Sequence, residues 1–340
     1  MNTKRLSEIL KCISKVSIGI IGDFCLDAYW DLTDRNPELS VETGKPTVEV
    51  AHQRYSLGGA GNVANNLAAL GVRNLCAFGV VGNDLFGREL LRQLENLKVA
   101  VRDNILLPSD WQTPVYAKPY RGTEEQNRID FGRSNSLLSD SESKLVSVLA
   151  KQLPKLDALI VNQQLPKSIF TPGIIHTLNQ HAGKHPKKIF LVDSRNFIPE
   201  FTSMFCKLNA IEAARIFGKT IKKNESATTS DLTEYSRKLF AQTGKPLFIT
   251  RGRLGILFFD GKKAAEIAAL NVKEPIDPVG AGDTVVAAIG SALAAGTTPT
   301  EACSFAMIAA SIAVKKLRET GTASPDEILA TSRDNSEHLG

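Results

Sequence analysis

The sequence predicts an α/β fold with a mostly parallel central sheet, and two observations lead to this prediction. Short apolar runs bounded by glycine or aspartate recur along the chain, and stretches with helical periodicity separate them. Unbroken apolar runs suit strands that are buried on both faces, as in parallel sheets. Because the two patterns alternate, we expect helices on both faces of one sheet.

Five segments are predicted to be core strands. They are rich in Val, Ile, Leu and Phe, and they cover residues 16–24, 75–82, 158–164, 188–194 and 246–252. Helical patterns lie between them, for example at 62–71, 84–97 and 231–244. The first and third of these helical segments end at a glycine, which suits the position just after a helix.

Two segments break this alternation. Residues 29–55 and 113–133 contain period-2 patterns and paired strand-like runs, without a helical period. We expect them to be antiparallel strands inserted into the α/β core as a lid, and lids exclude water from a reacting centre. Residues 1–330 are assigned to this single domain, and 331–340 are predicted to be a flexible tail.

Composition and charge exclude several classes of protein. The 340 residues are 43% hydrophobic and 23% charged, which is ordinary for a globular protein. The net charge of +5 is spread along the chain, without the dense basic stripe of a nucleic-acid interface. No segment reaches the roughly 18 apolar residues of a membrane helix. Five scattered cysteines form no C-x-x-C pair, and lysines interrupt the apolar N-terminal pattern, so we expect a cytoplasmic protein.

The stretch DPVGAGDT, residues 277–284, precedes a helix of small apolar residues. Its glycines allow consecutive N–H groups to point one way, and a helix N-terminus adds partial positive charge, so the pattern favours an anion site. Asp283 lies in the same loop, where a carboxylate can accept a proton from an attacking hydroxyl. The alternative is that Asp283 only caps the helix.

A second glycine cluster, SLGGAGNVANNLAALG at 56–71, also runs into a helix. Gly58, Gly59 and Gly61 permit close approach of the backbone to a ligand, and Asn62 can cap the helix or hydrogen-bond a hydroxyl. Tight packing of the helix on the sheet explains the same glycines. The spacing is not that of a dinucleotide fingerprint or of a phosphate loop of the G-x-x-x-x-G-K-[ST] type.

Two aspartates, Asp23 and Asp27, follow the first predicted strand. Ligands of open α/β sheets bind outside the carboxyl ends of the strands, so carboxylates here are well placed to hold sugar hydroxyls. For Asp23, a solvated strand end is the preferred interpretation.

Together, these motifs resemble those of the ribokinase-like (PfkB) carbohydrate kinases. The aspartates after the first strand, the cluster at 56–71, VGNDLFG at 81–87, LNAIEA at 208–213 and DPVGAGDT occur in that family's order and approximate spacing. The resemblance covers nearly the whole chain. It implies a three-layer α/β sandwich with a small β lid, and an ATP-dependent enzyme that phosphorylates a sugar hydroxyl.

The resemblance also implies roles for single residues. Asp283 matches the base that takes the proton of the attacking hydroxyl, and the backbone of Gly280, Ala281 and Gly282 matches an anion hole. Asn209 and Glu212 match N-x-x-E, which positions Mg²⁺ through water, and a surface helix start is their alternative. Substrate contacts fall on Asp27, Gly58, Gly59 and Asn62, and nucleotide contacts on Thr250, Gly252 and Gly255. Activation by a monovalent cation stays open.

Within the family, the likeness extends to the heptose 7-phosphate kinases. Ser40, Glu42 and Pro46 keep that subgroup's S-x-E-x-x-x-P spacing, and NRIDF at 127–131 also matches. The chain departs at 162–166, where NQQLP replaces an aspartate–tyrosine and lysine–glycine loop. This departure leaves two alternatives open, a ribokinase- or fructokinase-type kinase of a free sugar and a sugar-binding module without catalysis.

The lid segments carry two further expectations. A substrate that already bears a phosphate needs a basic partner, and the candidates in the lid are Lys45, Lys118, Arg121, Arg128 and Arg133. The lid strands leave a sheet edge, and the likeness to family members that dimerise through their lids implies a homodimer.

Overall fold

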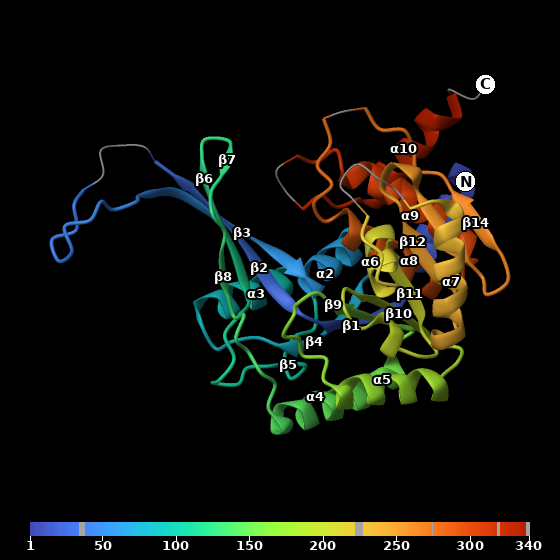
Figure 1. The fold of residues 1–340 in the computed structure, drawn as a ribbon. Helices are drawn as coiled ribbons and strands as arrows, with labels where there is room; N and C mark the ends of the chain where they lie inside the picture. The colour runs from blue at the N-terminus through green and yellow to red at the C-terminus, as the bar shows by residue number, and fades with distance from the viewer. Residues whose placement is uncertain (34–37, 222–226, 274, 318–319, 338–340) are drawn as a thin grey trace.

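The computed structural model describes residues 1–33, 38–221, 227–273, 275–317 and 320–337. Within these residues, nine strands form the central sheet in the order β14-β13-β12-β11-β10-β9-β1-β4-β5. The pairs from β5 to β12 are parallel, and β13 and β14 add an antiparallel edge. Figure 1 shows helices on both faces of this sheet. The predicted α/β architecture is confirmed.

The strands of the central sheet include all five predicted ones. They are β1 (Ser17–Gly22), β4 (Asn74–Val80), β5 (Ile105–Leu106), β9 (Ala158–Gln163), β10 (Ile189–Ser194), β11 (Phe205–Asn209), β12 (Leu247–Thr250), β13 (Ile256–Phe259) and β14 (Ala264–Ile267). Strand β1 is shorter than the predicted segment 16–24, because the chain leaves this sheet at Asp23 and enters a second sheet at Phe24.

Two buried clusters separate the helices into two layers. Ile18 and Ile20 of β1 face the cluster that contains α1 (Thr3–Ile13), α2 (Ala60–Ala69), α3 (Leu85–Asn96), α8 (Ala281–Ala294), α9 (Pro299–Ala313) and α10 (Pro325–Glu337). Ile21 faces the other cluster, with α4 (Ser139–Gln152), α5 (Pro172–Lys184), α6 (Ala210–Ile216) and α7 (Thr229–Thr243). Since neighbouring strand residues point to opposite faces, one apolar run serves both layers.

The three helices predicted from periodicity are α2, α3 and α7. The first begins two residues earlier than predicted, at Ala60. Gly244 follows α7 in the left-handed conformation, with φ of 72°, and its N–H donates to the Phe240 carbonyl. This is the C-terminal glycine that the sequence predicted.

The lid is a second sheet of β3 (Val50–Gly59), β2 (Phe24–Leu32), β6 (Val115–Arg121) and β7 (Glu124–Glu125), with β8 (Ile129–Phe131) paired to β6. Figure 1 shows it projecting from the body. It begins at Phe24, five positions before the predicted boundary at 29. The β2–β6 pair is parallel, contrary to the prediction of antiparallel strands, because both strands run outward while β3 and β8 return. Residues 34–37 of the predicted lid lie outside the described residues.

Residues 331–337 of the predicted flexible tail continue α10 as helix, and the flexibility of the tail stays a prediction. Ser324 and Glu327 cap this helix reciprocally, because the Glu327 N–H donates to Ser324 Oγ and the Ser324 N–H donates to Glu327 Oε2. Ile328 is fully buried against the body. Residues 338–340 lie outside the described residues. In the described part of the chain, no helix combines the length and apolarity needed to cross a membrane.

Candidate active site

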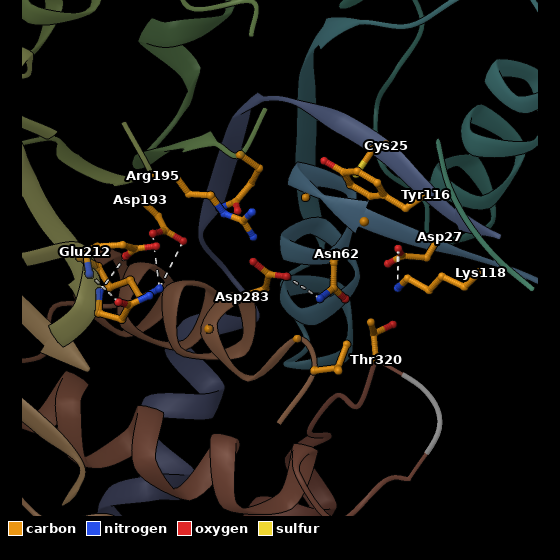
Figure 2. Close-up of a pocket in the computed structure, with 18 of the residues that line it drawn as sticks. Cys25, Asp27, Asn62, Tyr116, Lys118, Asp193, Arg195, Glu212, Asp283 and Thr320 are labelled. Carbon is orange, nitrogen blue, oxygen red and sulfur yellow. Dashed lines mark hydrogen bonds and ion pairs between the residues drawn. The ribbon is translucent and has the colours of Figure 1, made fainter. Parts of the chain in front are cut away.

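Nine predicted site residues line one cavity of about 350 Å³ between the lid and the carboxyl ends of the central strands. They come from the lid, from α2, from the start of α6 and from the start of α8, and they are Asp27, Gly58, Gly59, Asn62, Asn209, Glu212, Gly280, Gly282 and Asp283. Figure 2 shows Asp283 and Asn62 near the middle of this cavity, between the Asp27 end and the Glu212 end.

The glycine turn before α8 presents free backbone donors to the cavity. Gly280 has φ of 79°, in the left-handed region that glycine tolerates best. Among the described residues, the N–H groups of Gly280 and Gly282 make no backbone hydrogen bond. The Ala281 N–H donates to the Pro278 carbonyl at 3.1 Å. Ala281 also does not line the cavity, so only two of the three predicted anion-hole donors are available.

Asp283 is held by a residue from the other glycine cluster. Asn62 Nδ2 donates to Asp283 Oδ2 at 2.7 Å. Burial raises the pKa of Asp283 above its ordinary value, although the hydrogen bond from Asn62 and the charges of Lys207 and Arg195 oppose this rise. A carboxylate with a raised pKa is a stronger proton acceptor, which suits a general base.

A buried ion pair forms part of the cavity wall beside the glycine turn. Lys207 and Asp193 occupy paired positions on β11 and β10, and their charged groups lie 3.3 Å apart. Burial lowers the pKa of Lys207, but the carboxylates of Asp193, Glu212 and Asp283 outweigh it and raise the pKa overall. Lys207 therefore stays protonated. A Cβ atom added to Gly282 would lie 3.4 Å from Lys207 Nζ, which places this cation next to the predicted anion hole.

Arg195 follows β10 and lines the same cavity. Figure 2 shows its side chain reaching toward Asp283. In the described part of the chain, its guanidinium group has no ion-pair partner. The sequence did not predict Arg195, Lys207 or Asp193 as site residues. A usable signal was present, because a charged residue inside a strand buried on both faces requires a partner, and both Asp193 and Lys207 are such residues.

At the lid end of the cavity, the cations are already paired. Lys118 Nζ lies 2.8 Å from Asp27 Oδ1. Arg128 lies over the Tyr116 ring at 4.4 Å and contacts Asp130 at 2.6 Å. Of the basic candidates for a substrate phosphate, only Lys118 and Arg128 line the cavity, whereas Lys45, Arg121 and Arg133 do not.

The glycines at 58 and 59 also have a packing role. A Cβ atom on Gly59 would lie 2.4 Å from the Asp23 carbonyl oxygen, and its φ of 54° is left-handed. A Cβ atom on Gly58 would lie 2.8 Å from Cys25 Sγ. The packing interpretation is therefore realised, and the same glycines line the cavity, so their contact with a ligand stays a prediction.

Asn209 and Glu212 form a capping box at the start of α6. The Glu212 N–H donates to Asn209 Oδ1 and the Asn209 N–H donates to Glu212 Oε2, each at 2.8 Å. The alternative of a helix start is thus realised, and the same two side chains line the cavity. Glu212 Oε1 has no hydrogen-bond partner among the described residues and can meet a ligand.

The three predicted nucleotide contacts do not line this cavity. Thr250 ends β12, one strand beyond Asn209, with which it is paired. Gly255 has φ of 86°, and a Cβ atom there would lie 2.0 Å from the Ile267 carbonyl oxygen. Packing against β14 is thus enough to require this glycine. Nucleotide contact by Thr250, Gly252 and Gly255 stays a prediction.

The preferred interpretation of Asp23 as a solvated strand end is wrong. Asp23 is 2% exposed, and its carboxylate accepts hydrogen bonds from Ser168 Oγ and from the N–H groups of Gln164, Leu165 and Ile169. These bonds offset the burial of the carboxylate, although burial still raises its pKa overall. They fix the loop that begins with NQQLP, from which only Gln164 lines the cavity.

This arrangement suits transfer of a phosphoryl group to a hydroxyl. It combines a carboxylate base, free N–H donors at a helix start, and the cations Lys207 and Arg195 close to both. Residues 20–327 match the model of the pfkB family of carbohydrate kinases. The chain belongs to this family and is a carbohydrate kinase.

Curated relatives and solved structures agree with this assignment. The chain is 29% identical to the bifunctional protein HldE of Citrifermentans bemidjiense and 31% identical to that of Pelobacter propionicus. Each alignment covers 97% of this chain and 66% of the relative, so the chain spans just under two thirds of their length. Ribokinase of Thermotoga maritima has a TM-score of 0.69 at 19% identity, covering 94% of this chain and 99% of its own. Phosphofructokinase-2 of Escherichia coli has a TM-score of 0.71 at 19% identity, with the same coverage. These structures show the ribokinase-like fold.

Proposed function

We propose that this carbohydrate kinase transfers the γ-phosphate of ATP to a hydroxyl of a sugar phosphate, and that it is similar to the heptose 7-phosphate kinases. The observation that carries the proposal is the position of Asp283, which is held by Asn62 and lies beside the glycine turn and Lys207. A base, an anion site and a cation thus converge in one cavity.

In the proposed mechanism, the chain's own residues orient and stabilise the reacting groups. Asp283 takes the proton of the attacking hydroxyl. The N–H groups of Gly280 and Gly282, with Lys207 and Arg195, stabilise the negative charge that develops on the transferred phosphoryl group. ATP supplies the phosphoryl group. The lid covers the Asp27 end of the cavity and limits the access of water.

Mg²⁺ fits this site through water. Among the described residues, no cluster of three or more His, Cys, Asp or Glu side chains could hold a metal ion directly. Glu212 keeps one free carboxylate oxygen after capping α6, and Mg²⁺ in kinases retains several waters and binds chiefly to substrate phosphates. We therefore assign Asn209 and Glu212 to the outer shell of the ion. A monovalent cation stays a prediction.

The likeness to HldE proteins supports a phosphorylated sugar as substrate. A specific observation favours the second candidate, a ribokinase- or fructokinase-type kinase of a free sugar. Both lid cations that line the cavity are already paired, Lys118 with Asp27 and Arg128 with Asp130. A substrate phosphate must therefore compete with these carboxylates. A sugar-binding module without catalysis has less support, because the base is in place.

We also propose that the protein is a homodimer through its lid and that it is cytoplasmic. Strand β3 lies at the edge of the lid sheet and is exposed over residues 50–54. Next to it, the extension of residues 38–49 exposes Leu39, Val41 and Val48. An unpaired edge with apolar side chains nearby is usually covered. Analytical ultracentrifugation is expected to give twice 36.9 kDa, and a mass of 36.9 kDa at all concentrations contradicts the dimer.

Release of ADP with a panel of acceptors tests the proposed function. The panel contains heptose 7-phosphate, free heptose, hexoses, pentoses and nucleosides. We expect the largest kcat/KM with heptose 7-phosphate. If kcat/KM is larger with a free sugar, the sugar-phosphate kinase is contradicted and the free-sugar kinase is supported. If calorimetry shows sugar binding but no acceptor yields ADP, both kinase candidates are contradicted. The remaining candidate is then the sugar-binding module without catalysis.

A further inference from the structure

A chain of hydrogen bonds links α2 to the first turn of α8. Thr284 Oγ1 donates to Asn66 Oδ1 at 2.7 Å. Asn66 Nδ2 donates to the Asn62 carbonyl oxygen at 2.9 Å and to Asn62 Oδ1 at 3.3 Å. Asn62 Nδ2 then donates to Asp283 Oδ2 at 2.7 Å. The three polar side chains are at most 1% exposed, so each depends on these partners.

The donors in this chain all point the same way, toward Asp283. The hydroxyl of Thr284 fixes the oxygen of the Asn66 amide, and the Asn66 NH₂ group fixes the oxygen of the Asn62 amide. Asn62 must then turn its own NH₂ group toward Asp283. The opposite orientation of Asn62 would place its oxygen against a carboxylate and its NH₂ group against another NH₂ group. Hydrogen bonds in such a series also strengthen one another.

The two carboxylate oxygens of Asp283 therefore differ. Oδ2 is engaged by Asn62. Among the described residues, Oδ1 has no hydrogen-bond donor, and Asp283 lines the cavity. One oxygen is fixed inside the protein and the other is available to a ligand.

We propose that Thr284 and Asn66 are positioning residues of the phosphoryl transfer, which act through Asn62 to hold Asp283 so that its Oδ1 takes the proton of the attacking hydroxyl. This inference rests on the proposed function. In the step, the O–H bond breaks and its proton passes to Oδ1. The hydroxyl oxygen forms a bond to the γ-phosphorus of ATP, and the bond from that phosphorus to the leaving ADP oxygen breaks.

Other charged groups also face Asp283, and they are left in place in the test. Lys207 on β11 and Arg195 after β10 lower the pKa of Asp283, and Asp27 on β2 raises it. Asp193 on β10 also interacts with it electrostatically. These charges are unchanged in a Thr284 variant that lacks the hydroxyl, which loses the bond to Asn66 and two longer contacts, to the Gly280 and Gly321 carbonyl oxygens at 3.3 and 3.5 Å.

The experiment compares Thr284→Val, which keeps the shape and removes the hydroxyl, with Thr284→Ser, which keeps the hydroxyl. Ser291→Ala is the matched control, because Ser291 is fully buried in the same helix and, within the described part of the chain, its hydroxyl donates to the Ala288 carbonyl alone. Each variant is measured in two ways. ¹³C NMR titration follows the pKa of the Asp283 carboxyl, and steady-state kinetics give kcat and the KM of each substrate.

In Thr284→Val, we expect a higher pKa of Asp283 and a kcat lower by roughly 10- to 100-fold, part of the 10²–10⁴-fold that a general base contributes. Both KM values should stay within about twofold, because binding contacts are kept. Thr284→Ser is expected to retain most of the wild-type kcat, and Ser291→Ala all of it. If Thr284→Val matches Ser291→Ala in pKa or in kcat, the proposal is wrong.

Two further controls keep the result decisive. If circular dichroism shows that Thr284→Val does not fold, Thr284→Ala replaces it, and the same two outcomes apply. If the wild-type protein forms no ADP with any acceptor, the proposed function fails, but the titration needs no turnover. In that case, an unchanged pKa of Asp283 in the Thr284→Val variant still contradicts the proposal that Thr284 helps to position Asp283.

Discussion

Asn62 and Asp283 lie 221 positions apart in the sequence, and their side chains are joined by a hydrogen bond of 2.7 Å. This bond joins the glycine cluster that starts α2 to the glycine turn that starts α8. Two motifs that are individually weak in sequence thus form one site. The bond also leaves Asp283 oriented toward the cavity, where a proton acceptor is needed.

The pH dependence of the reaction should report the environment of Asp283. Burial raises the pKa of this carboxyl above its ordinary value of 3.8. A general base works only when it is deprotonated, so kcat/KM should fall as the pH drops through this raised pKa. A pH–rate profile with heptose 7-phosphate or the preferred sugar checks this. An acid limb centred at or below 3.8 contradicts the prediction.

Replacement of Lys207 should reduce both stability and catalysis. Lys207→Met leaves the buried carboxylate of Asp193 without its partner, which typically costs about 3–5 kcal/mol of unfolding free energy. Urea unfolding measures this loss. We expect kcat to fall as well, because a cation next to Gly282 is removed.

The double variant Lys207→Met/Asp193→Asn separates the two effects. It removes both charges, so most of the lost unfolding free energy should return. The kcat should stay low, since the cation is still missing. Recovery of both quantities in the double variant shows that Lys207 serves only the fold.

Substitution of Asp27 should weaken the binding of the sugar. Asp27→Asn removes the partner of Lys118 and the charged acceptor for a sugar hydroxyl, so the KM of the sugar should rise by about 10-fold or more. The KM of ATP should not change. Asp31→Asn, on the same strand but outside the cavity lining, is the control. Equal KM values for wild type and Asp27→Asn rule out this contact.

The contribution of Glu301 to stability should depend on pH. Hydrogen bonds from Arg5 and from the Thr298 N–H hold the pKa of Glu301 at about 2, below its ordinary value of 4.5. Because the pKa is lowered in the folded state, the stabilisation is present above pH 4.5 and is lost as the pH falls toward 2. Wild type should exceed Glu301→Gln by up to about 1 kcal/mol at neutral pH. Denaturant titrations should show this difference shrinking in acid, and a difference that is constant with pH argues against it.

The sequence predicted the α/β fold and nine of the residues that line the cavity, and many of these signals are local. Glycine clusters at helix starts, such as Gly280 and Gly282, reflect backbone conformation within a few residues. The proximity of Asp193 and Lys207 depends instead on the register of β10 and β11. The position of Arg195 depends on the direction of the loop that follows β10. Neither follows from spacing in the chain.

The sequence also did not predict which residues are packed against distant segments of the chain. Asp23 ends a strand, where a solvated carboxylate is usual, but the loop of residues 164–169 folds over it and donates four hydrogen bonds. For Gly255, whose nucleotide contact stays a prediction, the structure adds a close approach to β14 that the sequence did not reveal. In both cases, a distant segment determines the environment of the residue.

The central claim is that Asp283 is the base of a sugar kinase, and the kcat of Asp283→Asn tests it most directly. The substitution keeps the shape of the side chain and removes the proton acceptor. We predict a kcat lower by at least about 10²- to 10⁴-fold, with ATP binding in calorimetry and the unfolding midpoint close to wild type. A variant that folds, binds ATP and retains a kcat within a few-fold of wild type would contradict the account.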